Sequence, residues 1–224
     1  MPKRLWGFII VIVLAATACA PTPELRNDAY FHDTSLIDGE PCFAPCWRGL
    51  TPGETTWDVV EDTLETFEDV SNPVRERNRD TDEEYYDFHY TEGPQCCRVY
   101  TRDGSVLSSI LLLVAPDMSV GAVIEQYGEP QYIQAQDVTD DQTFVVLVFP
   151  QVPMLVYAFG AGITNGEITA DSEVIGMVYL ASSEMAVFLN ETALFTWDDY
   201  GALGAILSGE AVIPVSNEVP GESD

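Results

Sequence analysis

An internal repeat is the feature that most limits how this chain can fold. Residues 50–61 align without a gap on residues 114–125, at an offset of 64. Pro52 matches Pro116 and Thr55 matches Ser119. Each copy reads as a strand exit, a proline turn, a hydroxyl residue that can cap a helix, and an apolar helical stripe. The pattern predicts that one supersecondary unit occurs twice.

Two helices are expected from this pattern. The first covers 55–70 and is stopped by Asn72-Pro73, and the second covers 119–128 and is ended by Gly128. Three strands are expected after each helix: 85–90, 95–101 and 106–114, and then 143–149, 152–159 and 174–181. We therefore predict an α+β fold of two tandem helix–strand–strand–strand repeats, with antiparallel sheet or sheets and helices packed on one face.

The domain boundaries follow from these elements. Repeat 1 is predicted over 42–114 and repeat 2 over 115–190, with a further possible strand at Met185–Leu189. Thr196 can cap a last helix, so a C-terminal helix is predicted within 191–208. Residues 209–224 are acidic and contain proline, which predicts a flexible tail.

The second helix segment, 118–130, carries a family resemblance. Its small cap, apolar stripe and closing Gly128-Glu129-Pro130 resemble the helix motif of SmpA/OmlA (BamE-type) envelope lipoproteins. The chain also resembles the related β-lactamase-inhibitor-like fold, which pairs helices with an antiparallel sheet in tandem repeats. The first copy departs from the motif, with Leu64-Glu65 in place of Gly128-Glu129. The resemblance implies a small non-catalytic module that binds other proteins, and it maps no functional residues.

The first 18 residues are typical of an export signal. Lys3 and Arg4 precede an apolar run of 14 residues, which is short for a membrane-spanning helix of about 20. The run ends in Ala16-Thr17-Ala18-Cys19, which resembles the lipobox of bacterial lipoproteins, although leucine is usual where Ala16 stands. In that family the cysteine carries acyl chains such as palmitate and begins the mature protein. The alternatives are an ordinary secretory signal and a retained transmembrane anchor.

The expected cellular location follows from this segment. We predict a signal peptide over 1–18 and a lipidated tether over 19–41, in which two prolines favour extended backbone. The protein is then exported and lipid-anchored to the extracytoplasmic face of the cell membrane, or to an outer membrane. Residues 41–53 also resemble the N-terminal part of uncharacterised lipoproteins from filamentous environmental bacteria. This resemblance implies the same membrane location and indicates no activity.

Acidic residues dominate the charge. The chain has 37 Asp and Glu against nine Lys and Arg, for a formal net charge of −28. Loss of Lys3 and Arg4 with the signal would make it −30, and Lys3 is the single lysine. Such a surface repels nucleic acid, which excludes nucleic-acid binding. The acids either attract cationic partners or Ca²⁺, or form a solubilising surface, and their even spread along the chain favours the second interpretation.

Four cysteines follow Cys19: Cys42, Cys46, Cys96 and Cys97. An even number in an exported chain predicts disulfides. Adjacent strand residues point to opposite faces, which disfavours a bridge between Cys96 and Cys97. Either Cys42 and Cys46 each join one of that pair, or they close on each other, and we expect at least one long-range bridge. A zinc site from all four lacks the usual C-x2-C spacing.

No catalytic motif is visible. His32 lies in the expected tether, and His89 lies among aromatic residues of an expected strand. The chain has no Gly-x-Ser-x-Gly, Ser-x-x-Lys, His-Glu-x-x-His or P-loop sequence. A mature chain without lysine cannot form a Schiff base. We therefore predict a protein that is not an enzyme and needs no cofactor.

A calcium loop is the remaining candidate site for a metal. Asp80, Asp82 and Glu84 alternate as calcium ligands do, but Tyr85 stands where the sixth position needs glycine. The alternative is a solvated loop before a strand. The same alternatives apply to Asp137, Asp140 and Asp141.

Two further clusters admit two interpretations each. Three arginines, Arg75, Arg77 and Arg79, either balance the neighbouring acids or form a contact site, and the first is favoured. The strand aromatics either form an exposed binding face or, as is more usual, belong to the core and to cross-strand pairs. They are Tyr85, Tyr86, Phe88, Tyr90 and Tyr100.

These features favour a membrane-anchored, non-enzymatic protein-interaction module with an unknown partner. The alternative is an envelope protein that binds a small ligand or calcium. An exposed aromatic patch would favour a protein partner. A closed cavity between the helices and the sheet would favour a small ligand, and a cluster of convergent carboxylates would favour calcium.

Overall fold

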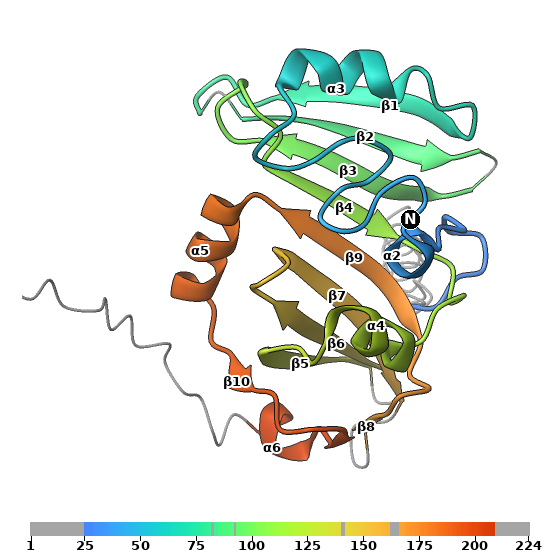
Figure 1. Ribbon diagram of the computed structural model, residues 1–224, viewed down its shortest axis with the longest axis vertical. Coiled ribbons are helices and arrows are strands. Elements are labelled where there is room, and N and C mark those ends of the chain that lie inside the picture. Colours follow the sequence, from blue (N-terminus) through green and yellow to red (C-terminus); the bar gives the residue numbers. More distant parts are fainter. Residues whose placement is uncertain (1–24, 82, 92, 140–141, 162–165, 209–224) are drawn as a thin grey trace, which may run out of the picture.

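The structure is a computed structural model that describes residues 25–208 apart from 82, 92, 140–141 and 162–165. Figure 1 shows a large twisted sheet with short helices beside it. The helices are α2 (Ser35–Asp38), α3 (Trp57–Leu64), α4 (Val120–Tyr127), α5 (Ser182–Glu191) and α6 (Gly204–Leu207). The predicted signal peptide, Cys19 and the tail 209–224 lie outside the described residues.

The predicted α+β class is confirmed, and one sheet contains nine antiparallel strands in the order β1-β2-β3-β4-β9-β7-β6-β5-β10. The strands are β1 (Val70–Arg77), β2 (Glu84–Tyr90), β3 (Gln95–Thr101), β4 (Ser109–Leu113), β5 (Tyr132–Thr139), β6 (Gln142–Phe149), β7 (Met154–Ala161), β9 (Val174–Leu180) and β10 (Phe195–Thr196). A separate pair joins β8 (Glu167–Ile168) to β11 (Gly201–Ala202). The two halves of the chain therefore share one sheet.

The halves meet where β4 pairs with β9. Leu111 lies opposite Val178, and the pairing runs from Ser109↔Leu180 to Leu113↔Gly176. All seven residues of β9 are buried, because this strand has neighbours on both sides and side chains packed on both faces. The centre of the sheet is thus built from the last strand of each half.

Two of the long strands, each of eight residues, were not predicted. The predicted first helix, 55–70, ends at Leu64, and Val70–Arg77 forms β1 instead. Pro73 suits an edge strand, because its missing N–H removes no bond from a ladder on the free side. The strand β5 was missed because its sequence is largely polar, and Ile133 is the one buried residue among its eight. Residues 57–113 consequently contribute one long helix, α3, and four strands to the main sheet, residues 120–180 contribute α4 and four strands, and β10 is the ninth strand.

The helix starts correct the predicted register by one residue. Thr56, and not Thr55, is the N-cap of α3, because the Thr55 hydroxyl accepts a hydrogen bond from the backbone N–H of Thr51 at 2.8 Å. Ser119 caps α4 as predicted and accepts from the N–H of Ala122 at 3.3 Å. The first residues of the two helices, Trp57 and Val120, are therefore 63 positions apart in the chain.

The C-terminal region differs from the prediction. A helix, α5, replaces the possible strand at Met185–Leu189. The helix expected within 191–208 is reduced to Gly204–Leu207, preceded by the short strands β10 and β11. Asp199 has a φ of 79°, and Gly201 and Gly204 are poor helix formers, so the backbone cannot continue a helix through this stretch.

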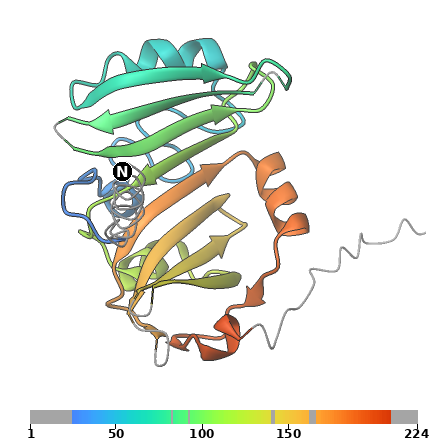
Figure 2. The same cartoon turned by 180° about the vertical axis from the view of Figure 1, so that it is seen from behind.

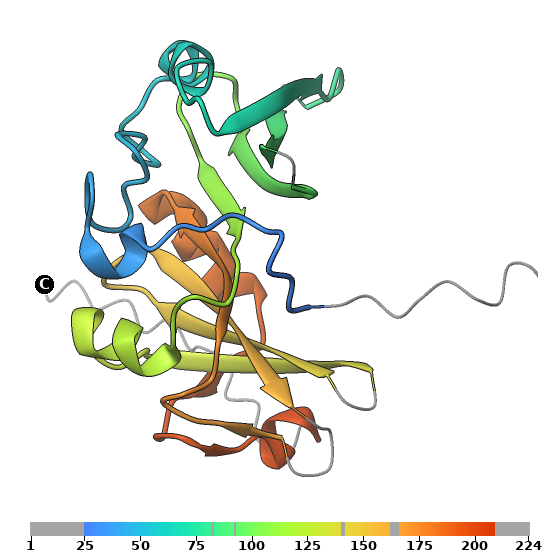
Figure 3. The ribbon, with the colours of Figure 1, turned by 90° about the vertical axis from the view of Figure 1, so that its right-hand side faces the viewer.

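The helices were predicted to pack on one face of the sheet, but they pack on both faces. Residues of α3 and α4 join the main core with one set of strand side chains, and α2 contributes Leu36 to the same cluster. Figure 3 shows these three helices on one side of the sheet. Met185 of α5 joins a second cluster made of the alternate strand residues, such as Val146 and Val178. These alternate residues face the opposite side, so α5, visible at the end of β9 in Figure 2, packs on the other face.

The segment 25–41 is folded onto the body and is not part of a tether. Phe31 forms a parallel bridge with Val114 and is 1% exposed, and Leu36 is fully buried. This packing could not be predicted from a local pattern, because the buried residues follow no regular period. This segment supplies one layer of the main core.

A glycine marks the tight contact between the halves. A Cβ at Gly176 would lie 2.9 Å from the carbonyl oxygen of Leu112 in β4 and 3.2 Å from the ring of Tyr157. We predict that Gly176→Ala lowers the free energy of unfolding by about 1–3 kcal/mol, since the sheet must shift to admit a methyl group. Urea denaturation measures the change. Gly204→Ala is the control, because nothing lies within 4 Å of its Cβ position, and an equal loss in both variants would contradict the prediction.

Candidate interaction site

A groove of about 410 Å³ lies between α2 and α4. Its apolar residues include Ile37, Met118 and Ala122, and three carboxylates stand around them. The full lining is Thr34, Ile37, Asp38, Pro116, Asp117, Met118, Ser119, Ala122 and Glu173. A groove with apolar walls and an acidic rim can accept an amphipathic side chain that carries a positive charge.

The rim carboxylates are held in place by nearby groups. Asp117 pairs with His32 at 2.6 Å, and Glu173 accepts a hydrogen bond from Arg26 at 2.6 Å. Asp38 accepts from the backbone N–H of Glu40 and from the Thr34 hydroxyl, and these bonds lower its pKa. Asp38 is therefore ionised at neutral pH. His32, expected in a tether, instead helps to form this rim.

A disulfide loop borders the groove. Cys42 and Cys46 form a disulfide with each other, which was one of the two predicted pairings. The expected long-range bridge to Cys96 or Cys97 is therefore wrong. Phe43 in this loop is 52% exposed and packs over Gly39, where a Cβ would lie only 2.3 Å from the ring. Gly39 has a φ of +70° at the end of α2, so both the turn and the ring require glycine.

The loop is also attached to α4. The backbone N–H of Ala44 donates to the hydroxyl of Tyr127 at 3.3 Å. The same helix contributes Ala122 to the groove, so α4 supports both features. We call the α2–α4 groove together with the Cys42–Cys46 loop the loop–groove surface.

Trp47 fixes this surface to the core. Its indole N–H donates to Asp33 at 2.8 Å, and its ring stacks on Phe88 of β2 with centroids 5.8 Å apart. Asp33 also accepts hydrogen bonds from the N–H and hydroxyl of Ser35, the first residue of α2. A buried carboxylate therefore links the residue after Cys46 to the start of α2.

Arg48 supplies a second anchor. Its guanidinium donates two hydrogen bonds to Asp69, at 2.6 and 2.7 Å, and lies over the rings of Phe31 and Phe67 at 4.8 and 5.2 Å. The planar cation can satisfy the carboxylate in its plane and the rings on its faces. The bonds from Arg48 lower the pKa of Asp69, against the opposing effect of partial burial.

The remaining cysteines form a bridge that was disfavoured from sequence. Cys96 and Cys97 are bonded to each other in β3. The strand pairing shifts at this point: Phe88 lies opposite Cys97 and His89 opposite Gln95, so Cys96 is the extra residue of a β-bulge. A bulge changes the direction of a side chain and removes the strict alternation on which the prediction depended. Both cysteines are buried, beside a shallow depression that Asp87 and Arg98 also line.

The calcium candidates are not brought together as a site. Glu84 is buried and accepts hydrogen bonds from Arg75 at 2.6 Å and from the Trp57 indole at 3.1 Å. Arg77 lies 3.3 Å from the same carboxylate. Asp80 is exposed, and Asp82 lies outside the described residues. Within the described ranges, no group of three His, Cys, Asp or Glu side chains could hold a metal ion.

The strand aromatics belong mainly to the core. Tyr86 and Phe88 are buried, and Tyr90 packs against the core beside Phe31. Tyr85 and Tyr100 face each other across β2 and β3 on the open face and are partly exposed. His89 lies 3.4 Å from the carbonyl of Gly93 and forms no ion pair among the described residues. Phe43, which the sequence did not single out, is the most exposed large aromatic in the part of the chain that the structure describes.

The Arg48–Asp69 pair generates a pH prediction. We expect Asp69→Asn to lower the free energy of unfolding at pH 7 by about 1 kcal/mol, discounted because the Asp69 side chain is 37% exposed. Asp69 has a lowered pKa in the folded protein, so its contribution is complete above the ordinary value of 3.8 and is lost as the pH falls through the folded value. The difference from wild type should therefore shrink in acid.

Urea denaturation at a series of pH values from 7 down to 2 measures this difference. Asp62→Asn is the control, because Asp62 is exposed and makes no ion pair within the part of the chain that the structure describes. A difference between wild type and Asp69→Asn that stays constant with pH would show that the ion pair is not its source.

Comparisons with known proteins found no match. No family model matches the sequence, no curated protein is similar to it, and no solved structure is similar to the fold. No helix among the described residues is both long and apolar enough to cross a membrane. The function is therefore inferred from the contacts, exposure and charges of the chain itself.

Proposed function

We propose that this chain is an exported lipoprotein, held on a membrane by lipid on Cys19, whose body is a non-enzymatic module that binds a partner protein. We propose the loop–groove surface as its binding site. The observation that carries this proposal is Phe43, a large aromatic that is 52% exposed on a loop closed by a disulfide.

The rigidity of the loop supports this assignment. A disulfide across Cys42 and Cys46, the bond from Ala44 to Tyr127 and the contact of Phe43 with Gly39 hold the ring in one place. An aromatic that is already ordered loses little conformational entropy on binding, and such residues commonly dominate interface energies. The adjoining groove offers a partly apolar pocket for a neighbouring side chain of the partner.

The charge of the surface indicates the kind of partner. Asp38, Asp117 and Glu173 stand beside the apolar walls, and the chain as a whole is strongly acidic. Acidic rims favour and steer basic partners, whereas nucleic acid and anionic lipid are repelled. We therefore propose a partner with an apolar contact for Phe43 and a basic side chain for the groove.

We also propose that the two halves are copies of one unit. Each half has a helix followed by four strands of the main sheet. In each, the first helical N–H donates to a residue shortly before the last strand: Trp57 to the Ser105 carbonyl at 2.9 Å, and Val120 to the Ser172 carbonyl at 2.8 Å. A shared contact of this kind supports a repeat, and with it the resemblance to BamE-type envelope modules that bind other proteins.

The interaction proposal is tested by photo-cross-linking in intact cells with the lipidated protein. A photoreactive residue at Ile37, in the groove, should capture a specific partner, and one at Val187, which is 39% exposed on α5, should not. Adding Phe43→Ala should reduce capture from position 37 about tenfold or more, the usual effect of removing an aromatic anchor. Capture that is equal from both positions, or unchanged by Phe43→Ala, would reject the loop–groove surface.

The lipid anchor is tested separately. We expect the wild-type chain to sediment with membranes and to carry the added mass of acyl chains on Cys19. Cys19→Ser removes the thiol that would be acylated, so this variant should lack that mass and leave the membrane fraction. Membrane association of Cys19→Ser equal to wild type would indicate a retained anchor, and a soluble exported wild type would indicate an ordinary signal.

A further inference from the structure

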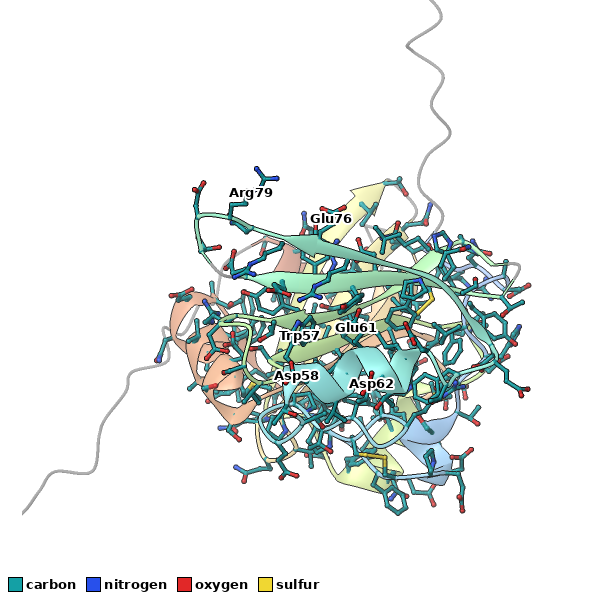
Figure 4. All side chains as sticks on the ribbon, turned by 90° about the horizontal axis from the view of Figure 1, so that it is seen from above. Trp57, Asp58, Glu61, Asp62, Glu76 and Arg79 are labelled. Atoms are coloured by element: carbon teal, nitrogen blue, oxygen red, sulfur yellow. A yellow bond between two sulfur atoms is a disulfide. The ribbon has the colours of Figure 1, made fainter. Side chains whose placement is uncertain are left out.

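A second and smaller pocket lies between α3 and the edge strand β1. It measures about 70 Å³ and is lined by Glu61, Leu64, Glu65, Pro73 and Tyr86. Residues four apart share a helix face, so Trp57, Glu61 and Glu65 project from α3 in one direction. Figure 4 shows Trp57 and Glu61 on the side of α3 toward the strands, and Asp58 and Asp62 on the outer side.

The shape of the edge strand creates this space. The pairing of β1 with β2 shifts between Ser71 and Val74, and Asn72 within the shift has a φ of 50°. The strand is thereby displaced next to Tyr86, and Pro73 lines the opening. Proline has no N–H, so the backbone of residue 73 offers no donor to the pocket.

The hydroxyl of Tyr86 lacks a hydrogen-bond partner in this position. Tyr86 is 4% exposed, and its hydroxyl makes no hydrogen bond of 3.5 Å or less to any residue that the structure describes, although it interacts with the carboxylate of Glu61. Burial, and then the nearby Glu61, raise the pKa of Tyr86 to about 12, so the group keeps its proton at neutral pH. A buried hydroxyl without a partner is costly, which indicates that another molecule supplies one.

The carboxylates of the pocket are only loosely neutralised. Arg75 lies 3.6 Å from Glu61 but makes its closer bond, 2.6 Å, to Glu84. Glu65 makes no ion pair with any residue that the structure describes. The pocket therefore combines two carboxylates with a neutral hydroxyl, an arrangement that favours a cation over an anion or a neutral group.

Size and donor number select among cations. A volume of about 70 Å³ holds roughly two waters, or one compact head group with its first carbon. A primary ammonium has three N–H donors, and the pocket offers three acceptor groups: the carboxylates of Glu61 and Glu65 and the hydroxyl of Tyr86. We propose that this pocket binds a primary ammonium group from another molecule. The chain itself has no lysine except Lys3, so its own body supplies no such group.

This inference is independent of the loop–groove surface. The ammonium group can come from a lysine side chain of a protein or from a small free amine, and both have the same chemistry at the pocket. A bare divalent ion is a poorer match, because the described residues provide no group of three acidic or other metal-binding side chains.

The test is an NMR titration of the full mature protein, in detergent, followed at the backbone amides of residues 61–65. Methylammonium should give a saturable shift, whereas tetramethylammonium, which has no N–H donor, should not. Tyr86→Phe and Glu65→Gln should each weaken methylammonium binding about tenfold, as expected for loss of one hydrogen bond to a charged group. Asp62→Asn, on the outer side of α3, should leave it unchanged.

Tyr86→Phe also keeps the aromatic ring, so a folded protein is expected and the variant isolates the hydroxyl. A further titration with Nα-acetyl-lysine methylamide separates the two sources. Binding comparable to that of methylammonium assigns the pocket to lysine side chains, and binding of methylammonium alone assigns it to small amines. No saturable shift with methylammonium, or an equal shift with tetramethylammonium, would overturn the proposal and leave a pocket that holds water only.

Discussion

Two parts of the loop–groove surface, α2 and the Cys42–Cys46 loop, depend on the burial of Trp47. Its indole reaches Asp33 on the side of α2, and its ring packs against Phe88 of the sheet. Cys46 is its chain neighbour, so the same residue also positions the disulfide loop. A buried indole N–H needs its acceptor, since an unpaired one costs about 1–3 kcal/mol. One hydrogen bond thus couples the N-terminal segment, the loop and the sheet, which explains why residues 25–41 cannot remain a free tether.

The sequence predicted what depends on local pattern. Apolar periodicity and caps located the second helix, and three of the four main-sheet strands in each half were predicted close to their observed positions. What it missed depends on non-local geometry. The bulge at Cys96 allows the adjacent cysteines to form a disulfide, and no local sequence pattern predicts this bulge. The candidate site itself was not predicted: Cys42 and Cys46 were expected only to form disulfides, and the groove requires α2 to lie against α4, far away in the chain.

Several of the few arginines form ion pairs with carboxylates on other elements. Arg48, Arg98 and Arg102 each donate two hydrogen bonds to one carboxylate. Their acceptors are Asp69, Asp87 and Glu184 respectively. A guanidinium matches a carboxylate in this two-point manner and a lysine does not, which suits a body without lysine. The acids left over, including Glu65, then remain available to cations from other molecules.

The position of the described N-terminus bears on how such a body would meet a membrane. If Cys19 carries the lipid, five residues lie between it and Leu25, and a chain of that length spans at most about 20 Å. Leu25 bonds to Gln142 at the start of β6, and Figure 3 shows the chain beginning on the side of the sheet opposite α2 and α4. A short connection to the lipid on that side would hold the start of β6 toward the bilayer and turn the loop–groove surface away from it. Repulsion between an acidic body and anionic lipid favours the same orientation, because it keeps the rim carboxylates away from the membrane.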